Sequence, residues 1–127
     1  MKYYSTGNIP KEDSGIVYFN KKGDKLNDKD IHKQQYYAAQ KENTFTRRIR
    51  SEDQTRFEEF KTTETQYFVR THQNVPLDPL GPYSKRERNL DTKMTRVSKN
   101  TFDFYVTYLK TNNSIYLTKA TRGVMND

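Results

Sequence analysis

The sequence predicts a small α+β protein that forms a single domain over residues 1–127. Two patterns lead to this prediction. Short runs of β-branched and aromatic residues end at turn residues, and apolar residues near the C-terminus recur at helical spacing. A length of 127 residues is also typical of one domain. We therefore expect a few short strands and several helices around one core.

The first third of the chain is expected to contain an extended arm, a strand and a helix. Two glycines and a proline lie among polar residues in 1–15, which favours an extended N-terminal arm. Residues 16–19 (IVYF) predict a strand, and 20–24 (NKKGD) predict the turn that ends it. A helix near 29–42 is then expected, capped by Asp28. Ile31, Gln35, Ala38 and Ala39 would share one side of it, with Tyr36 nearby.

A second helix is expected near 52–62, followed by a strand. Residues 51–54 (SEDQ) fit a capping box, in which the serine hydroxyl and the glutamine side chain bind free N–H groups of the first turn. Phe57 and Phe60 are three residues apart and would share one face of that helix. Residues 66–71 (QYFVRT) predict a strand because they are rich in β-branched and aromatic residues.

The last third predicts an ordered crossover and a pair of helices. Three prolines and a glycine within 72–86 favour a non-helical crossover. Residues 102–123 predict a helical hairpin, although strand propensity in its first half leaves a β-hairpin as the alternative. The helical template is matched twice, and each match follows a capping residue, Thr101 or Ser114. The matching residues are Phe102, Tyr105, Val106 and Leu109, and then Leu117, Ala120, Thr121 and Val124.

The chain is poor in aliphatic residues and rich in tyrosine. Leu, Ile, Val and Phe make up about 19% of it, just under the ~20% below which charged chains are usually disordered, and there are 10 tyrosines. A tyrosine ring provides contact area while its hydroxyl stays in water, which suits contact between surfaces. We therefore predict aromatic anchors for contact with other chains. The candidates are Tyr3, Tyr4, Tyr36, Tyr37, Tyr83, Tyr105, Tyr108 and Tyr116.

The net charge of +7 is concentrated in the second half of the chain. Residues 1–60 have 12 basic and 10 acidic side chains, whereas residues 61–127 have 11 and 6. Such a surplus attracts phosphates or acidic protein surfaces, so contact with DNA or RNA phosphates is one prediction. The candidate basic contact patch is Arg47, Arg48, Arg50, Lys85, Arg86, Arg88, Lys93, Arg96 and Lys99.

The sequence has none of the motifs that carry common enzyme chemistry. It has no cysteine, no serine in a GxSxG motif and no phosphate-binding glycine loop. The acidic residues of 24–30 do not match the spacing of a calcium loop, and the two histidines are forty positions apart. No apolar stretch is long enough for a membrane span. We predict a protein that is not an enzyme, with no cofactor, no metal, no small-molecule substrate and no membrane contact.

One region also resembles a known group of proteins. Within 66–123, the residues that carry the likeness are YFVRT at 67–71, PLGPYS at 79–84, VSK at 97–99, Phe102, Tyr105, YLKTNN at 108–113, Tyr116, Leu117, Ala120 and Arg122. In these residues the chain resembles small uncharacterised structural proteins of tailed bacteriophages. The resemblance implies a place in the virion, after assembly in the host cytoplasm, and transfers no catalytic motif.

These observations together predict a structural protein of a large assembly. We expect a minor component of a tailed-phage virion, from the neck, tail, baseplate or capsid, that bridges larger subunits through aromatic and basic contacts. Its partners would be other protein subunits of the complex. The alternative is a small basic protein that binds nucleic acid or, encoded by a phage, regulates or inhibits a host protein.

Overall fold

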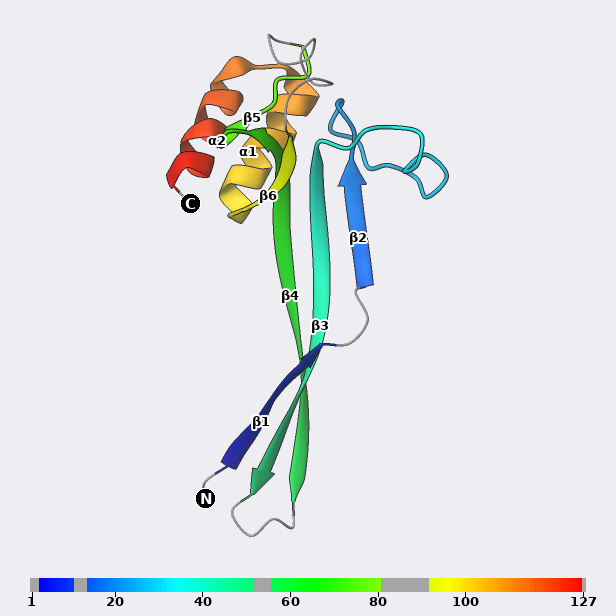
Figure 1. Ribbon diagram of the computed structural model, residues 1–127, viewed down its shortest axis with the longest axis vertical. Coiled ribbons are helices and arrows are strands. Elements are labelled where there is room, and N and C mark those ends of the chain that lie inside the picture. The colour runs from blue at the N-terminus through cyan, green and yellow to red at the C-terminus, as the bar shows by residue number, and fades with distance from the viewer. Residues whose placement is uncertain (1–2, 11–13, 52–55, 81–91, 127) are drawn as a thin grey trace. The chain divides into compact units, whose positions relative to one another are not determined.

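In the computed structural model, the described residues are 3–10, 14–51, 56–80 and 92–126. Six strands precede two helices along the chain, as Figure 1 shows. The strands are β1 (Tyr3–Pro10), β2 (Ser14–Phe19), β3 (Ala38–Ser51), β4 (Phe57–His72), β5 (Val75–Pro76) and β6 (Lys93–Val97). The helices are α1 (Lys99–Thr111) and α2 (Ser114–Asn126). The predicted α+β class is confirmed.

The strands form a 6-stranded sheet in which β3 and β4 have the most neighbours. β3 pairs with β1, β2 and β4, and β4 pairs with β3, β5 and β6. Thr71 in β4 is opposite Pro76 of β5 and also opposite Lys93 of β6, both antiparallel. A strand residue has one partner on each edge, so β5 and β6 flank β4 on opposite edges at this point.

The chain divides into two compact units, and each is described by itself. Unit 1 comprises Met1–Ile16 and Lys41–Thr65, and unit 2 comprises Val17–Gln40 and Gln66–Asp127. The two long strands β3 and β4 contribute residues to both. That the chain is one domain over residues 1–127 stays a prediction.

The apolar core belongs to unit 2. The two helices, the adjoining parts of β2, β3, β4 and β6, and the residues just before β3 and just after β5 supply its side chains, and aromatic rings fill much of it. The Phe102 ring lies 5.5 Å from that of Phe19 and 5.0 Å from that of Tyr67, centroid to centroid. The buried residues are Phe19, Tyr37, Ala38, Val69, Leu77, Val97, Phe102, Tyr105, Tyr108, Leu109, Ala120 and Val124.

The predicted C-terminal helical hairpin is confirmed, and the alternative of a β-hairpin is wrong. The helical stripe is the buried side of α1, where Phe102, Tyr105 and Leu109 are all in the core. The helix begins at Lys99, earlier than expected, because Ser98 is the N-cap and its side chain accepts a hydrogen bond from the Thr101 N–H. Asn112 ends α1 in the left-handed conformation, with φ of 56°.

The predicted helix near 29–42 is wrong. Residues 27–34 form successive hydrogen-bonded turns, in which the Asn27 and Asp30 carbonyls each accept two N–H groups, and the chain then enters β3 at Ala38. The Tyr37 N–H donates to the Phe19 carbonyl, and the Tyr37 carbonyl accepts from the Arg70 N–H. Backbone partners on both sides of Tyr37 stabilise an extended chain here and override the weak helical pattern.

The predicted helix near 52–62 is also wrong over its described part, because Phe57 to Thr62 belong to β4. Ser51 uses its hydrogen-bonding groups to close a hairpin: its N–H donates to the Arg56 carbonyl, and its Oγ accepts from the Arg56 N–H at 3.3 Å. In a strand, Phe57 and Phe60 point to opposite faces. Residues 52–55 of the expected capping box lie outside the described residues.

The two predicted strands are confirmed, since 16–19 lie in β2 and 66–71 lie in β4. The extended arm over 1–15 and the crossover over 72–86 stay predictions. Residues 3–10 form β1, and residues 75–76 form β5, each within one of these ranges.

Candidate functional site

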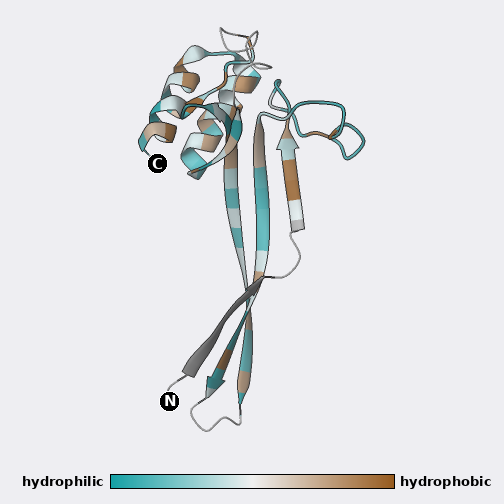
Figure 2. Ribbon diagram, viewed as in Figure 1, coloured by the Kyte–Doolittle hydropathy of each residue, from teal (hydrophilic) through white to brown (hydrophobic). Residues whose placement is uncertain are grey.

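The part of β3 and β4 that belongs to unit 1 is unusually exposed. We call residues 41–51 and 57–65 the ribbon. Every residue of β4 from Phe57 to Glu64 is exposed. Successive strand residues point to opposite faces, so both faces of this stretch meet solvent. Figure 2 shows that β3 and β4 are largely hydrophilic, with isolated hydrophobic residues. Two hydrophobic residues of the ribbon, Phe57 and Phe60, are 55% and 46% exposed.

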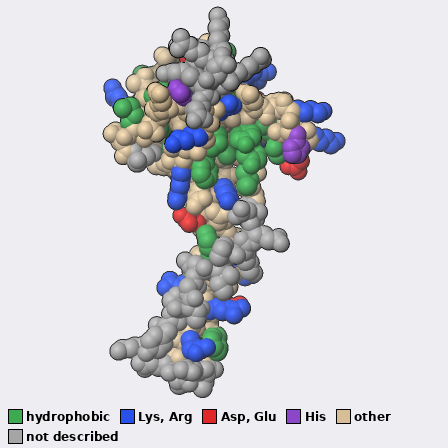
Figure 3. Space-filling model, viewed as in Figure 1, with side chains coloured by type: hydrophobic (Ala, Val, Ile, Leu, Met, Phe, Trp, Pro, Cys, Tyr) green, Lys and Arg blue, Asp and Glu red, His purple; other side chains and the backbone are tan. Residues whose placement is uncertain are grey.

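One face of the ribbon combines cations, a carboxylate and an aromatic ring. The Arg48 Nε donates to the Glu59 Oε1 at 3.1 Å, and both side chains are about half exposed. The Arg50 guanidinium carbon lies 4.9 Å from the centroid of the Phe57 ring, a cation–π distance. Along unit 1, Figure 3 shows basic side chains beside isolated hydrophobic ones. This face therefore carries both apolar area and charge.

The described buried residues of the ribbon are polar, unlike the core of unit 2. They are Asn43, Thr46 and Ser51. The Asn43 Oδ1, the Thr46 Oγ1 and the Arg50 Nε are buried without a hydrogen-bond partner in the described part of the chain. A buried polar atom that lacks a partner costs about 1–3 kcal/mol. The interior of the ribbon is thus polar and incompletely hydrogen-bonded, so it contributes little to stability.

Unit 2 contains a second candidate, which we call the lysine cleft. It has a volume of about 680 Å³ and is lined by Lys21, Lys22, Asp24, Pro79, Leu80, Leu109 and Lys110. Leu109 comes from the core side of α1, whereas the three lysine side chains are exposed. The lining therefore combines three cations and one carboxylate with the apolar side chains of Pro79, Leu80 and Leu109.

One wall of the lysine cleft is a turn held by Asn20. Its Oδ1 accepts the N–H groups of Lys22 and Asp24 at 2.9 and 3.1 Å. Gly23 in this turn has φ of 78° and packs on α1, where an added Cβ would lie 3.1 Å from the Val106 carbonyl oxygen. The close approach and the positive φ both require glycine. The turn is thus fixed against the helix, and it presents Lys21 and Lys22.

A second wall, formed by Pro79 and Leu80, is held by two tyrosines of α1. The Tyr105 hydroxyl donates to the Leu77 carbonyl at 2.6 Å, and the Tyr108 hydroxyl donates to the Asp78 carboxylate. The same carboxylate accepts the Leu80 N–H at 2.9 Å. Burial of the hydroxyl, and then the hydrogen bond to Asp78 and its charge, raise the pKa of Tyr108 well above its ordinary value. Leu80 is held in this way with 69% of its surface exposed.

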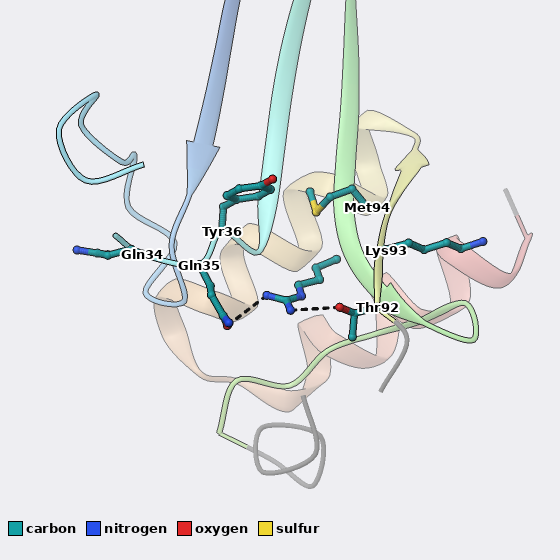
Figure 4. A pocket seen from close by; sticks show the side chains of 7 residues that line it. Gln34, Gln35, Tyr36, Thr92, Lys93 and Met94 are labelled. Carbon is teal, nitrogen blue, oxygen red and sulfur yellow. Dashed lines mark hydrogen bonds between the residues drawn. The ribbon is translucent and has the colours of Figure 1, made fainter. Parts of the chain in front are cut away.

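A third feature of unit 2 is a polar pocket around Arg70, shown in Figure 4. It has a volume of about 340 Å³. The Arg70 guanidinium donates to the Gln35 Oε1 at 3.3 Å and to the Thr92 Oγ1 at 3.1 Å. It also lies 5.5 Å from the centroid of the Tyr37 ring. Arg70 therefore connects β4 to the segments before β3 and β6, which is a structural role.

The predicted basic residues fall into separate groups. Arg47, Arg48 and Arg50 are in unit 1, and Arg47 lies on the face of β3 opposite to Arg48, because neighbouring strand residues alternate. In unit 2, Lys93 and Arg96 are in β6, and Lys99 begins α1. Lys85, Arg86 and Arg88 lie outside the described residues. That these residues contact one partner stays a prediction.

The predicted aromatic anchors also differ in their surroundings. Tyr37, Tyr105 and Tyr108 are buried in the core of unit 2 and serve the chain's own packing. Tyr36 is half-buried with its ring 4.4 Å from that of Tyr18, and Tyr116 is half-buried against the core. The side chains of Tyr3 and Tyr4, and all of Tyr83, lie outside the described residues.

The lysine cleft was not among the residues predicted from the sequence. Lys21 and Lys22 lie almost ninety positions before Lys110 in the sequence. Only the docking of the 20–24 turn on α1 brings the three lysines together. A local signal was present, because Asn20 and Gly23 indicate a turn that exposes the two residues between them. The sequence could not show which helix the turn packs against.

No cluster of three or more histidine, aspartate or glutamate side chains suited to a metal ion occurs in the described residues. Within the same residues, neither helix has the length and apolar character that a bilayer-spanning segment needs. Compared with known proteins, the chain matches no family model, no curated protein and no solved structure.

Proposed function

We propose that this protein is a structural component of a tailed-phage virion, without enzymatic activity, that bridges larger protein subunits. Its mechanism is contact: the ribbon of unit 1 binds a neighbouring subunit, and unit 2 supplies a folded body with an apolar core. The resemblance of residues 66–123 to small phage structural proteins provides the context. The exposure of β4 from Phe57 to Glu64 is the observation that carries the proposal.

The exposed ribbon has little apolar burial of its own to stabilise it. β1 pairs with β3 along the ribbon, and a small sheet of this kind needs an apolar face or packing against another element to be stable by itself. The ribbon offers Phe57 on one face and Phe60 on the other, so a subunit on either side would find an aromatic contact. Its buried polar atoms that lack partners lower the stability of the ribbon by itself. Binding would supply the burial that the described residues of the ribbon lack.

Photo-cross-linking within purified particles tests this proposal. Phe60 is replaced by a photo-reactive phenylalanine analogue, which keeps the ring, and the phage that encodes the chain is grown with this variant. Irradiation of its particles is expected to join the chain to a second protein. The matched control places the same analogue at Ile115 of α2, which is similarly exposed, and expects a different cross-link or none.

Two results would contradict the proposal. One is a chain that is missing from purified particles, and the other is a chain that is present but forms no cross-link from Phe60. A cross-link from Phe60 to nucleic acid instead of protein would favour the alternative of a nucleic-acid-binding protein. That alternative has less support, because Arg48 is already paired with Glu59 and Arg50 already lies over Phe57.

A further inference from the structure

We propose that the lysine cleft of unit 2 binds an acidic peptide segment of a partner protein, with an apolar side chain of that segment seated against Leu80 and Leu109. This inference rests on the proposed function in assembly, because it names the chemistry of one partner. It concerns a different surface from the ribbon. The two proposals can therefore fail independently.

Charge is the first argument for an acidic ligand. Three lysines line the cleft against one aspartate. Within the described residues, none of Lys21, Lys22 and Lys110 makes an ion pair or a side-chain hydrogen bond. The cations therefore remain available to carboxylates from outside. Like charges held close together also repel one another, and a bound acidic segment would relieve that repulsion.

Preorganisation is the second argument. The turn that presents Lys21 and Lys22 is held by two hydrogen bonds to Asn20 and by the packing of Gly23 on α1. The wall formed by Pro79 and Leu80 is held by two tyrosine hydroxyls and the Asp78 carboxylate. Little backbone entropy would then be lost on binding, which favours affinity. An exposed leucine held on such a rigid wall provides an apolar contact for the peptide.

The lining favours a peptide over a nucleic acid. Proteins bind single-stranded nucleic acids by combining cations with aromatic rings on which the bases stack. The described lining of the cleft contains aliphatic side chains and no aromatic ring. The Asp24 carboxylate would also repel a phosphate backbone, whereas a peptide can place an amide or a cation beside it. Acidic residues interspersed with an apolar one match both parts of the lining.

The test measures binding of a defined probe to the full-length chain by fluorescence anisotropy. The probe is a fluorescein-labelled peptide in which Asp and Glu alternate with Leu. The comparison probes are the same peptide with Asn and Gln in place of Asp and Glu, and an oligothymidine strand. The acidic peptide is expected to bind at low salt and to weaken as salt is added, since exposed charges are screened.

Substitutions in the cleft then locate the binding. Lys21→Glu and Lys22→Glu are each expected to weaken binding about fivefold, as for an exposed ion pair that is reversed. Leu80→Ser is expected to weaken it about threefold through the loss of apolar contact. The control, Lys33→Glu, makes the same charge change on an exposed lysine outside the cleft lining. It is expected to leave affinity nearly unchanged, and circular dichroism verifies that all variants fold.

Several outcomes would overturn the inference. If Lys33→Glu weakens binding as much as the cleft variants do, the attraction is general and not a site. Equal binding of the neutral peptide would remove the requirement for acidity. Oligothymidine that binds through Lys21 and Lys22 while the peptide does not would identify nucleic acid as the ligand. None of these results would affect the cross-link expected from Phe60, so the function proposed for the ribbon is judged separately.

Discussion

Tyr105 and Tyr108 of α1 set the position of one wall of the lysine cleft. Their hydroxyls donate to the Leu77 carbonyl and to the Asp78 carboxylate, and both rings are buried. The sequence predicted these tyrosines as contacts with other chains because a ring with a hydroxyl suits a wet surface. In the structure the hydroxyls find partners inside unit 2 instead. The sequence could not distinguish these outcomes, because it does not show where Leu77 and Asp78 lie.

Removal of the Tyr108 hydroxyl tests that role. Tyr108→Phe is expected to lower the free energy of unfolding by about 1.5–3 kcal/mol, the usual cost of losing a hydrogen bond to a charged group. Chemical denaturation monitored by circular dichroism measures it. A matched substitution, Tyr116→Phe, removes the hydroxyl from a half-buried ring and is expected to lower the free energy of unfolding by less. Equal effects from the two variants would contradict the account.

The raised pKa of Tyr108 also predicts a pH dependence. Below pH 10.0, its ordinary value, folded and unfolded chains both keep the phenol proton, and the stabilisation is fully present. Above that pH the unfolded chain releases the proton while the folded chain retains it, so the free energy of unfolding falls as pH rises. Tyr108→Phe is expected to lose stability less steeply than the original chain above pH 10. Denaturation curves on either side of that pH compare the two slopes, and identical slopes would be inconsistent with the raised pKa.

At the scale of elements, the two helices approach closely where Gly123 of α2 meets Thr101 of α1. A Cβ at Gly123 would lie 3.0 Å from the Thr101 Cβ and closer still to its hydroxyl. The helical hairpin expected over 102–123 would end at this glycine, but α2 continues to Asn126 and the glycine serves packing. This role depends on a partner helix that local patterns do not identify.

Gly123→Ala is expected to destabilise unit 2 even though alanine favours helices. Overpacking typically costs about 1–3 kcal/mol, and the helical gain over glycine is at most about 1 kcal/mol. Thermal melting followed at a helical wavelength measures the result. In a Thr101→Ala background the same substitution is expected to cost less, because the hydroxyl and methyl that obstruct the new Cβ are absent. A stabilised Gly123→Ala variant would show that the helices do not meet at this glycine.

Sequence periodicity predicted α1 and α2 correctly, whereas it was wrong for 29–42 and for the described part of 52–62. The C-terminal stripes have large apolar side chains that a core can bury, so the periodic pattern reports a real buried face. The stripe in 29–42 contained only Ile31 as a large apolar residue, and hydrogen bonds of Tyr37 to Phe19 and Arg70 determined the backbone instead. The capping groups of Ser51 served a hairpin, because one hydroxyl can satisfy an N–H in either structure.

At the same scale, a substitution in the ribbon is expected to separate folding from binding. Phe60→Ser removes an exposed ring that the core of unit 2 does not include. We expect the free energy of unfolding to change by no more than about 0.5 kcal/mol, as for most surface substitutions. Chemical denaturation checks this, and a comparison of particles grown with each variant checks incorporation. A large loss of stability would mean that Phe60 serves the fold and not a partner.

The whole molecule combines a unit that has an apolar core with one whose described buried residues are polar. This difference explains how a chain with so little Leu, Ile, Val and Phe can fold, because its apolar residues are concentrated in unit 2. The low content of these residues, together with the many tyrosines, predicted contact with other chains, but it could not show which residues make that contact. Within the described chain, the ribbon is the part for which we propose that contact with other subunits supplies burial.

Amide hydrogen exchange of the full-length chain tests the central claim most directly. In dilute solution, amides of residues 41–51 and 57–65 are expected to exchange much faster than those of α1, because the ribbon has few buried apolar contacts to hold it closed. In purified particles the same amides are expected to become protected while α1 changes little. Ribbon amides that are as protected as α1 in the isolated chain would contradict the claim that partner subunits complete this part of the protein.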